Sequence, residues 1–126
     1  SQLQINGENF NLDQNPKVVP IFKDNRTFLP IRIIIETWQG KIEWNNTLKQ
    51  VTILVDKNSI ILTIQKSEAL VNGKITNIDE NKQVVPFIFN GRTMLPLRFI
   101  AENLHSQVEW DAKTQQITLI YPGRLT

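Results

Sequence analysis

The 126-residue chain has no cysteine, one histidine and one tyrosine, and these shortages exclude several kinds of site. Without cysteine there can be no disulfide, no thiolate zinc site, no iron–sulfur cluster and no cysteine nucleophile. A site of several imidazoles, or a Ser-His-Asp triad, would have only His105 to draw on. No serine lies in a Gly-x-Ser-x-Gly turn, and no glycine-rich phosphate loop is present. We therefore expect no catalytic residue, no metal ligand and no cofactor.

Long apolar runs and clusters of one charge are also lacking. Stretches such as 33–35 are far shorter than the roughly 20 apolar residues of a membrane span. The 14 basic and 12 acidic residues are scattered, for a formal net charge of +2, without the basic stripe typical of nucleic-acid binding. We expect neither a membrane span nor a nucleic-acid partner. Residues 1–4 already have the pattern of a strand, so we expect no signal peptide within this sequence, as in a mature or trimmed chain.

What the chain does contain is an internal repeat with an offset of 66 residues. Residues 3–55 align without gaps on residues 69–121, and 19 of these 53 positions are identical. The strongest blocks place 18–20 on 84–86 and 26–32 on 92–98. We interpret the sequence as two tandem copies, residues 1–58 and 59–126, that fold alike.

Turn residues divide each copy into short strands. Asn-Gly at 6–7, 72–73 and 90–91 supplies the two positive φ angles of a tight hairpin, for which the first copy also uses Asp24-Asn25. Residue patterns predict a strand at 84–89 and two C-terminal hairpins, 41–44 with 50–55 and 107–110 with 115–121. One further strand, 59–65, lies between the copies, and its counterpart would precede Ser1.

A proline starts the one helix expected in each copy. Pro30 and Pro96 suit the first helical position, where the missing N–H is not needed. Behind each proline, apolar residues at i, i+3, i+4 and i+7 form one helical face, which ends at Trp38 in the first copy and Leu104 in the second. Gly40 is expected to end the first helix in a left-handed conformation, and the end of the second helix is expected to differ.

The predicted fold class is α+β, with two repeated β-β-β-α-β-β units of mostly antiparallel sheet and one short helix each. A unit of about 55 residues buries little apolar surface alone. We therefore expect residues 1–58 and 59–126 to share a core within one compact domain.

Several of these residues together match a known pattern. The run 90–104 (NGRTMLPLRFIAENL), followed by VEWD at 108–111, resembles the copper amine oxidase-like N-terminal domain, also called the stalk domain. The first copy is similar, with DNRTFLPIR at 24–32 and IEWN at 42–45, and ALVNGK at 69–74 looks like the family's linking hairpin. The chain departs from the pattern at Asp24-Asn25, at Trp38 and at His105-Ser106. The resemblance covers nearly the whole chain.

The resemblance implies an appended module that is separate from the copper-bearing catalytic region. That region holds copper with three histidines and builds a quinone from a tyrosine, a set that His105 and Tyr121 alone cannot supply. The resemblance also implies exported proteins of Gram-positive bacteria, in which such modules stand beside cell-wall hydrolases or surface proteins. We therefore expect an extracellular or cell-wall-associated location.

Recurring acids are interpreted as structural. Glu36 recurs as Glu102 and Glu43 as Glu109, and such matched recurrence favours a structural role over a catalytic carboxylate pair. Turn formation explains Asp-x-Asn at 13–15, 56–58 and 79–81, because a calcium loop needs six or more oxygen ligands. His105 is interpreted as a solvated residue just after the second helix.

Six side chains at matched positions are the candidates for contact with a ligand or partner: Arg26, Arg92, Arg32, Arg98, Trp44 and Trp110. The arginines could form an anion-binding patch, but we favour the interpretation that they tie strand to helix through carbonyls or the glutamates of the helices. The tryptophans could stack on sugars, but packing in the core is the favoured interpretation, as it is for Trp38.

These features favour a non-catalytic extracellular stalk, spacer or interaction module of a bacterial cell-envelope or secreted protein. Its expected partners are other domains of the same polypeptide or other envelope proteins. One alternative is a module that binds cell-wall glycan or another polysaccharide. A second is a protein-interaction module that self-associates weakly through exposed sheet edges. An enzyme is the least supported alternative.

Overall fold

The computed structural model describes the backbone of residues 2–5, 8–11, 20–30, 32–111, 113 and 116–120. Side chains are described from residue 20 to residue 120, apart from those of residues 31, 33, 34, 37, 110, 112, 114 and 115. In this part of the chain neither helix is long and apolar enough to cross a membrane.

The described residues form thirteen strands and two short helices. In chain order these are β1 (Gln2–Ile5), β2 (Glu8–Asn11), β3 (Ile21–Lys23), β4 (Arg26–Pro30), α1 (Arg32–Thr37), β5 (Lys41–Asn45), β6 (Gln50–Val55), β7 (Asn58–Thr63), β8 (Glu68–Val71), β9 (Lys74–Asn77), β10 (Phe87–Phe89), β11 (Arg92–Pro96), α2 (Leu97–Asn103), β12 (Gln107–Asp111) and β13 (Gln116–Ile120).

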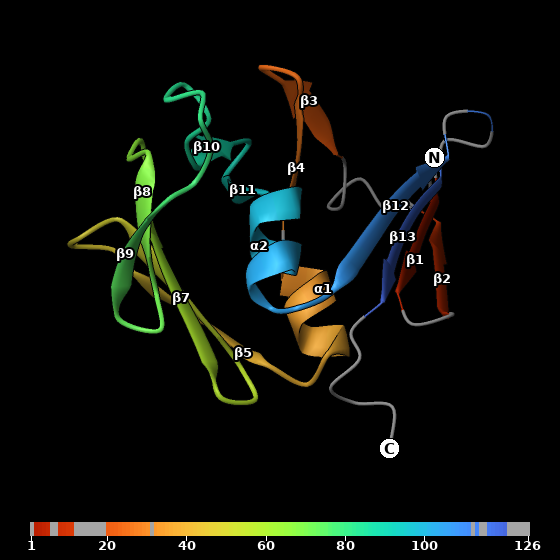
Figure 1. Cartoon of the computed structure of the whole chain (residues 1–126), viewed down its shortest axis with the longest axis horizontal. Coiled ribbons are helices and arrows are strands. Elements are labelled where there is room, and N and C mark those ends of the chain that lie inside the picture. The colour runs from red at the N-terminus through yellow and green to blue at the C-terminus, as the bar shows by residue number, and fades with distance from the viewer. Residues whose placement is uncertain are drawn as a thin grey trace.

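Three sheets are arranged around the two helices (Figure 1). The β4/β11 sheet has the strand order β10-β11-β4-β3, the β7 sheet has the order β5-β6-β7-β8-β9, and the β13 sheet has the order β12-β13-β1-β2. The helices α1 and α2 lie between the β7 sheet and the β13 sheet. Among the described strand pairs, all are antiparallel except β1 with β13. The fold is therefore α+β with mostly antiparallel sheets, as predicted.

Elements recur along the chain at the offset seen in the sequence. The strands β8 to β13 begin 66 residues after β1 to β6 respectively, and α2 begins 65 residues after α1. Each sheet combines strands that precede β7 with strands that follow it. The predicted boundary between residues 58 and 59 falls at the start of β7, and the division into two units stays a prediction.

The buried apolar side chains form a single cluster to which both halves of the chain contribute. The second helix buries Leu97, Ile100 and Ala101, followed by Leu104, as the helical spacing predicted. Trp38 is also buried, so its predicted place in the core is confirmed. Trp44 is 39% exposed, so its predicted place in the core is wrong. It lies near the end of β5, an edge strand with a neighbouring strand on one side only.

The predicted hairpin turns are confirmed where the structure describes them. Asn72-Gly73 has φ angles of 51° and 84°, and Asn90-Gly91 has φ angles of 51° and 76°. Asp24-Asn25 has 51° and 61°, which shows that this pair makes the same turn without glycine. The turn predicted at residues 6–7 lies outside the described residues.

The strands before each helix are where the predicted order differs from the structure. The predicted order of elements did not include β4 and β11. Each of these strands follows a hairpin turn, at 24–25 or 90–91, and ends at the proline that precedes the helix. Pro96 is the last residue of β11 and the N-cap of α2, with extended φ and ψ of −69° and 113°, so its predicted place as the first helical residue is wrong. The predicted strand 84–89 is shorter, because pairing begins only at Phe87, after Pro86 has removed a backbone donor.

The two helices end alike, which corrects two expectations. Gln39 and His105, each with φ of 61°, adopt the left-handed conformation that was expected at Gly40. The next backbone N–H then donates to the carbonyl five residues earlier, from Gly40 to Ile35 and from Ser106 to Ala101, both at 2.8 Å. A glycine is therefore needed at residue 40 for a different reason, which is close packing.

Replacing Gly40 by alanine should destabilise the domain strongly. A β-carbon at residue 40 would lie 2.6 Å from Leu54 O and 2.7 Å from Val55 Cγ2, so the backbone of β6 would have to move. We expect a loss of about 3 kcal/mol in the free energy of unfolding, measured by urea denaturation. Gly73→Ala is the control, because nothing lies within 4 Å of its β-carbon and only its φ of 84° is unfavourable, at about 1 kcal/mol. Equal losses would contradict the packing argument.

Candidate functional site

A cavity of about 560 Å³ lies between α2, the β3–β4 hairpin, the segment between β9 and β10, and the strands β12 and β13. Apolar side chains make up most of its wall, among them Phe22, Val84, Leu97, Phe99, Val108 and Ile117. Four charged side chains also line it: Arg26, Asp79, Arg98 and Glu102. The cavity is thus an apolar pocket with charges of both signs along its wall.

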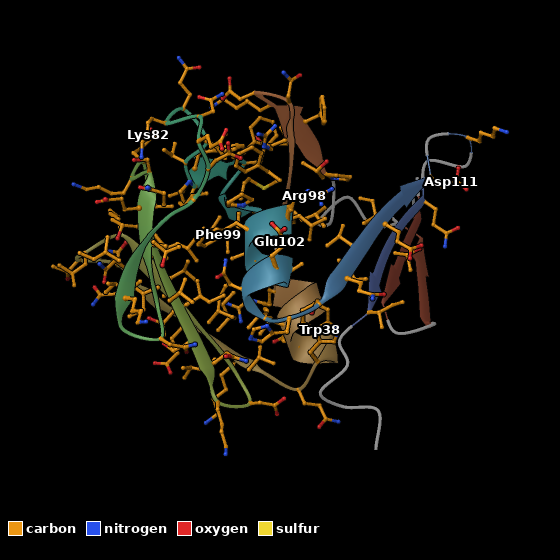
Figure 2. All side chains as sticks on the ribbon, viewed as in Figure 1. Trp38, Lys82, Arg98, Phe99, Glu102 and Asp111 are labelled. Atoms are coloured by element: carbon orange, nitrogen blue, oxygen red, sulfur yellow. The ribbon has the colours of Figure 1, made fainter. Side chains whose placement is uncertain are left out.

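The second helix forms one side of this pocket. Its buried face includes Leu97 and Phe99, which help to form the apolar wall. Arg98 and Glu102 lie four residues apart, so they project from the same, exposed side of the helix (Figure 2). The alternation of buried and exposed positions along α2 therefore gives the pocket both its apolar surface and part of its charge.

An ion pair between Arg26 and Asp79 joins two parts of the pocket wall. Arg26 Nε donates to Asp79 Oδ2 at 2.6 Å and Nη2 donates to Oδ1 at 3.1 Å, which is a two-point contact of guanidinium with carboxylate. The two residues are 53 positions apart in the chain, and their side chains are 39% and 15% exposed. The pair therefore fastens the start of β4 to the segment that follows β9.

The surroundings of Asp79 keep it ionised. The hydrogen bond from Arg26 lowers the pKa of the Asp79 carboxyl, and so does the hydrogen bond that Oδ1 accepts from the Asn81 backbone N–H at 2.9 Å. The same contact with Asp79 raises the pKa of the Arg26 guanidinium. Asp79 is consequently an anion at neutral pH with both oxygens engaged, which suits an attachment point and does not suit proton transfer.

The part of the chain described here contains no group of three or more His, Cys, Asp and Glu side chains that could hold a metal ion. His105 is exposed just beyond α2, as predicted for a helix-end residue, and it is not among the residues that line the pocket. The arrangement offers an apolar volume for a ligand group and polar atoms at its border.

The six predicted contact residues do not lie together. Arg26 and Arg98 both line the pocket. Arg32 lies exposed on α1, with Nη1 at 3.8 Å from Glu36 Oε2, and Arg92 donates from Nη1 to the Asn90 carbonyl at 3.2 Å in the β10–β11 turn. Trp44 lies on β5, and the side chain of Trp110 is outside the described residues. The structure thus brings two of the arginines to one site and separates them from the other two.

Sequence reasoning missed Asp79, Phe22 and Phe99 as residues of the site. Asp79 was interpreted as a turn former, which is confirmed by its bond to Asn81 and by the bond that Asn81 Oδ1 accepts from the Gln83 N–H. Its second role, as the partner of Arg26, depends on a contact between distant segments. The sequence did contain a signal for this contact, because the Asp-x-Asn turns at 13–15 and 79–81 occur at matched positions and so do the arginines at 26 and 92.

The Arg26–Asp79 pair should make stability depend on pH in acid solution. Because the pKa of Asp79 is lowered on folding, its stabilising contribution is present above its unfolded value of 3.8 and is lost as pH falls through the folded pKa. Asp79→Asn should therefore lower the urea midpoint at pH 7, by a small amount because the pair is partly solvated. The difference from the wild type should shrink below about pH 4. Glu80→Gln is the matched control, and a difference that is constant with pH would contradict the assignment.

Comparison with known proteins places this chain in a family. The chain matches the family model described as the copper amine oxidase N-terminal domain over residues 4–119, a stretch that contains both helices and every residue lining the pocket. No significant match was found among curated proteins or among solved structures. The chain therefore belongs to the copper amine oxidase N-terminal domain family, and the N-terminal domain in this family is a non-catalytic domain.

Proposed function

We propose that this domain is a non-catalytic interaction module of a secreted or cell-envelope bacterial protein, and that it holds a partner at the pocket beside α2. The observation that carries the proposal is the character of the pocket. Its wall is mostly apolar, and its ion-paired acid, Asp79, is held as an anion by Arg26. Such a pocket can bind an apolar group and orient its polar neighbours.

The proposed module consists of two tandem copies of one unit. This is supported by the 66-residue spacing of six strand pairs and by the register of β4 with β11. In that register Leu29 faces Leu95, Phe28 faces Pro96 and Pro30 faces Met94. Adding 66 to 28, 29 and 30 gives 94, 95 and 96, so the pairing is unchanged when the two halves are exchanged. Two copies joined in this way make one stiff body, which suits a stalk or spacer.

The partner that fits this pocket is a protein segment with an apolar side chain and polar groups next to it. Phe22 is 73% exposed on the edge strand β3 and also lines the pocket, so a bound side chain would cover it. Arg98 and Glu102 are exposed at the same site and are available to polar atoms of either sign. Other domains of the same polypeptide, or other envelope proteins, are the proposed source of this segment.

Photo-cross-linking from the pocket tests this function. The photoreactive amino acid p-benzoylphenylalanine would replace Phe22 in the full-length protein, expressed in the bacterium that produces it. Ile75 on β9 is the matched control, because it is equally exposed, at 73%, and does not line the pocket. We expect adducts from residue 22 to another envelope protein or another domain of the chain, at several times the yield seen from residue 75. Equal yields, or no adduct at either residue, would contradict the proposal.

A second candidate function is binding of cell-wall glycan, which the exposure of Trp44 favours. An indole that is 39% exposed on an edge strand can offer a ring face to a sugar. If this occurs, Trp44→Ala should abolish binding to purified peptidoglycan fragments in a fluorescence or NMR titration, whereas Trp44→Phe should keep part of it. Retained binding by Trp44→Ala, or no binding by the wild type, would leave the protein-binding function alone.

A further inference from the structure

The strand β7 holds a place in its sheet that has no equivalent in the β13 sheet, as far as the structure describes the chain. In the β7 sheet, β7 lies between β6 and β8 and is antiparallel to both. At the 66-residue offset, β6 corresponds to β13 and β8 corresponds to β1. In the β13 sheet these two strands are bonded directly to each other, in the single parallel pairing of the described strands.

The register of that parallel pair is the one that its two members would have around an intervening strand. Across β7, Val51 lies level with Leu62 and Ala69, and Thr52 lies level with Ile61 and Leu70. The corresponding positions in the β13 sheet are 117 with 3 and 118 with 4. The structure pairs Ile117 with Leu3 and Thr118 with Gln4. The strands β13 and β1 therefore keep the alignment they would have around an intervening strand, although no described strand lies between them.

The interior of the β7 sheet shows what the intervening strand contributes. Ile60 and Leu62 of β7 are fully buried. Ile60 lies between Ile53 and Val71, and Leu62 lies between Val51 and Ala69. Two antiparallel ladders of hydrogen bonds hold β7 in its sheet. In the β13 sheet, β13 and β1 are joined by one parallel ladder, and parallel pairing is slightly less stable per residue. A strand inserted between β13 and β1 would gain two ladders and bury two side chains at the expense of one parallel ladder.

We propose that β13 and β1 form a strand-accepting site, and that its occupant is an extended segment of about six residues carried on the N-terminal side of Ser1. This segment runs antiparallel to both strands. It presents two apolar side chains, two positions apart, toward the core, as Ile60 and Leu62 do in β7. The proposal does not depend on the function proposed for the pocket.

The connections on either side of the site favour this occupant. Thr63 at the end of β7 joins β8 through residues 64–67, and Ser1 stands at the position that corresponds to Ser67. A segment that precedes Ser1 could therefore enter β1 through a connection of the same length. On the other side, Pro122 stands at the position that corresponds to Asp56, whose φ is 53°. Proline holds φ near −65° and cannot make that turn, so a strand folding back from β13 is disfavoured.

A disulfide between the two strands tests the proposal, because the chain has no cysteine of its own. Gln4 and Thr118 are paired in neighbouring strands, about 4.8 Å apart, which is within the reach of a disulfide. An inserted strand would double that separation to about 9.6 Å, which is beyond reach. The double variant Gln4→Cys, Thr118→Cys would be prepared in the 126-residue chain and in a chain extended before Ser1 by a second copy of residues 58–66.

We expect the disulfide to form in the 126-residue double variant and to fall to background in the extended one. Two controls fix the interpretation. Thr52→Cys with Leu70→Cys places cysteines at the same register across β7 and should not form a disulfide. An extension in which the residues copied from Ile60 and Leu62 are aspartate should leave the disulfide intact, because charges cannot replace the buried side chains. A disulfide in both double variants, or in neither, would overturn the proposal.

Two further measurements keep the result clear. In the extended chain without cysteines, nuclear Overhauser contacts should join the extension to both β1 and β13, and their absence would count against insertion even if a cysteine variant failed to fold. The nine-residue segment should also be added to the 126-residue double variant as a separate peptide at equal concentration. The tethered segment should block the disulfide far more completely, since tethering raises its effective concentration. Equal blocking would overturn the assignment to the N-terminal side of Ser1 in favour of a foreign strand.

Discussion

The pairing of β4 with β11 is the contact on which the rest of the molecule depends. Leu29 and Leu95 face each other at its centre and are both completely buried. Each strand carries a hairpin partner, β3 or β10, on one side and leads within two residues into a helix. The rings of Phe28 and Phe87 meet edge to face, with centroids 4.9 Å apart, across the same sheet. One strand pair thereby determines where both helices begin and which sheets they can contact.

The pocket is a by-product of that arrangement, completed by one ion pair. The β3–β4 hairpin, α2 and β12–β13 come together because β4 lies beside β11, and their side chains leave an apolar volume between them. Arg26 and Asp79 then join the hairpin to the segment after β9, in addition to the burial of Ile78 and Val84 in the common core. Binding at such a pocket needs a wall that keeps its shape, and this contact provides part of it.

The features that were predictable from the sequence are those determined by neighbouring residues. Asn-Gly turns, the buried face of α2 and the pairing of β5 with β6 depend on conformational preference and spacing, and these were predicted correctly. The role of Gly40 was misread, because its reason is the approach of β6 and not its own φ. Trp44 was placed in the core because sequence does not show that β5 is an edge strand. The pocket joins residues from 20 to 117, and of its four charged residues only Arg26 and Arg98 were predicted as contact residues.

The adjacency of β1 and β13 has a consequence for the synthesis of the protein. The strand β1 takes its neighbour β13 from the far end of the described residues, so the β13 sheet cannot close until β13 has also been made. At about 5–20 residues per second that delay is on the order of ten seconds. For this period the β1–β2 hairpin has no sheet to join, and a lone hairpin is marginal in water. The nascent chain therefore exposes these strand edges for longer than a chain whose neighbouring strands follow each other in sequence.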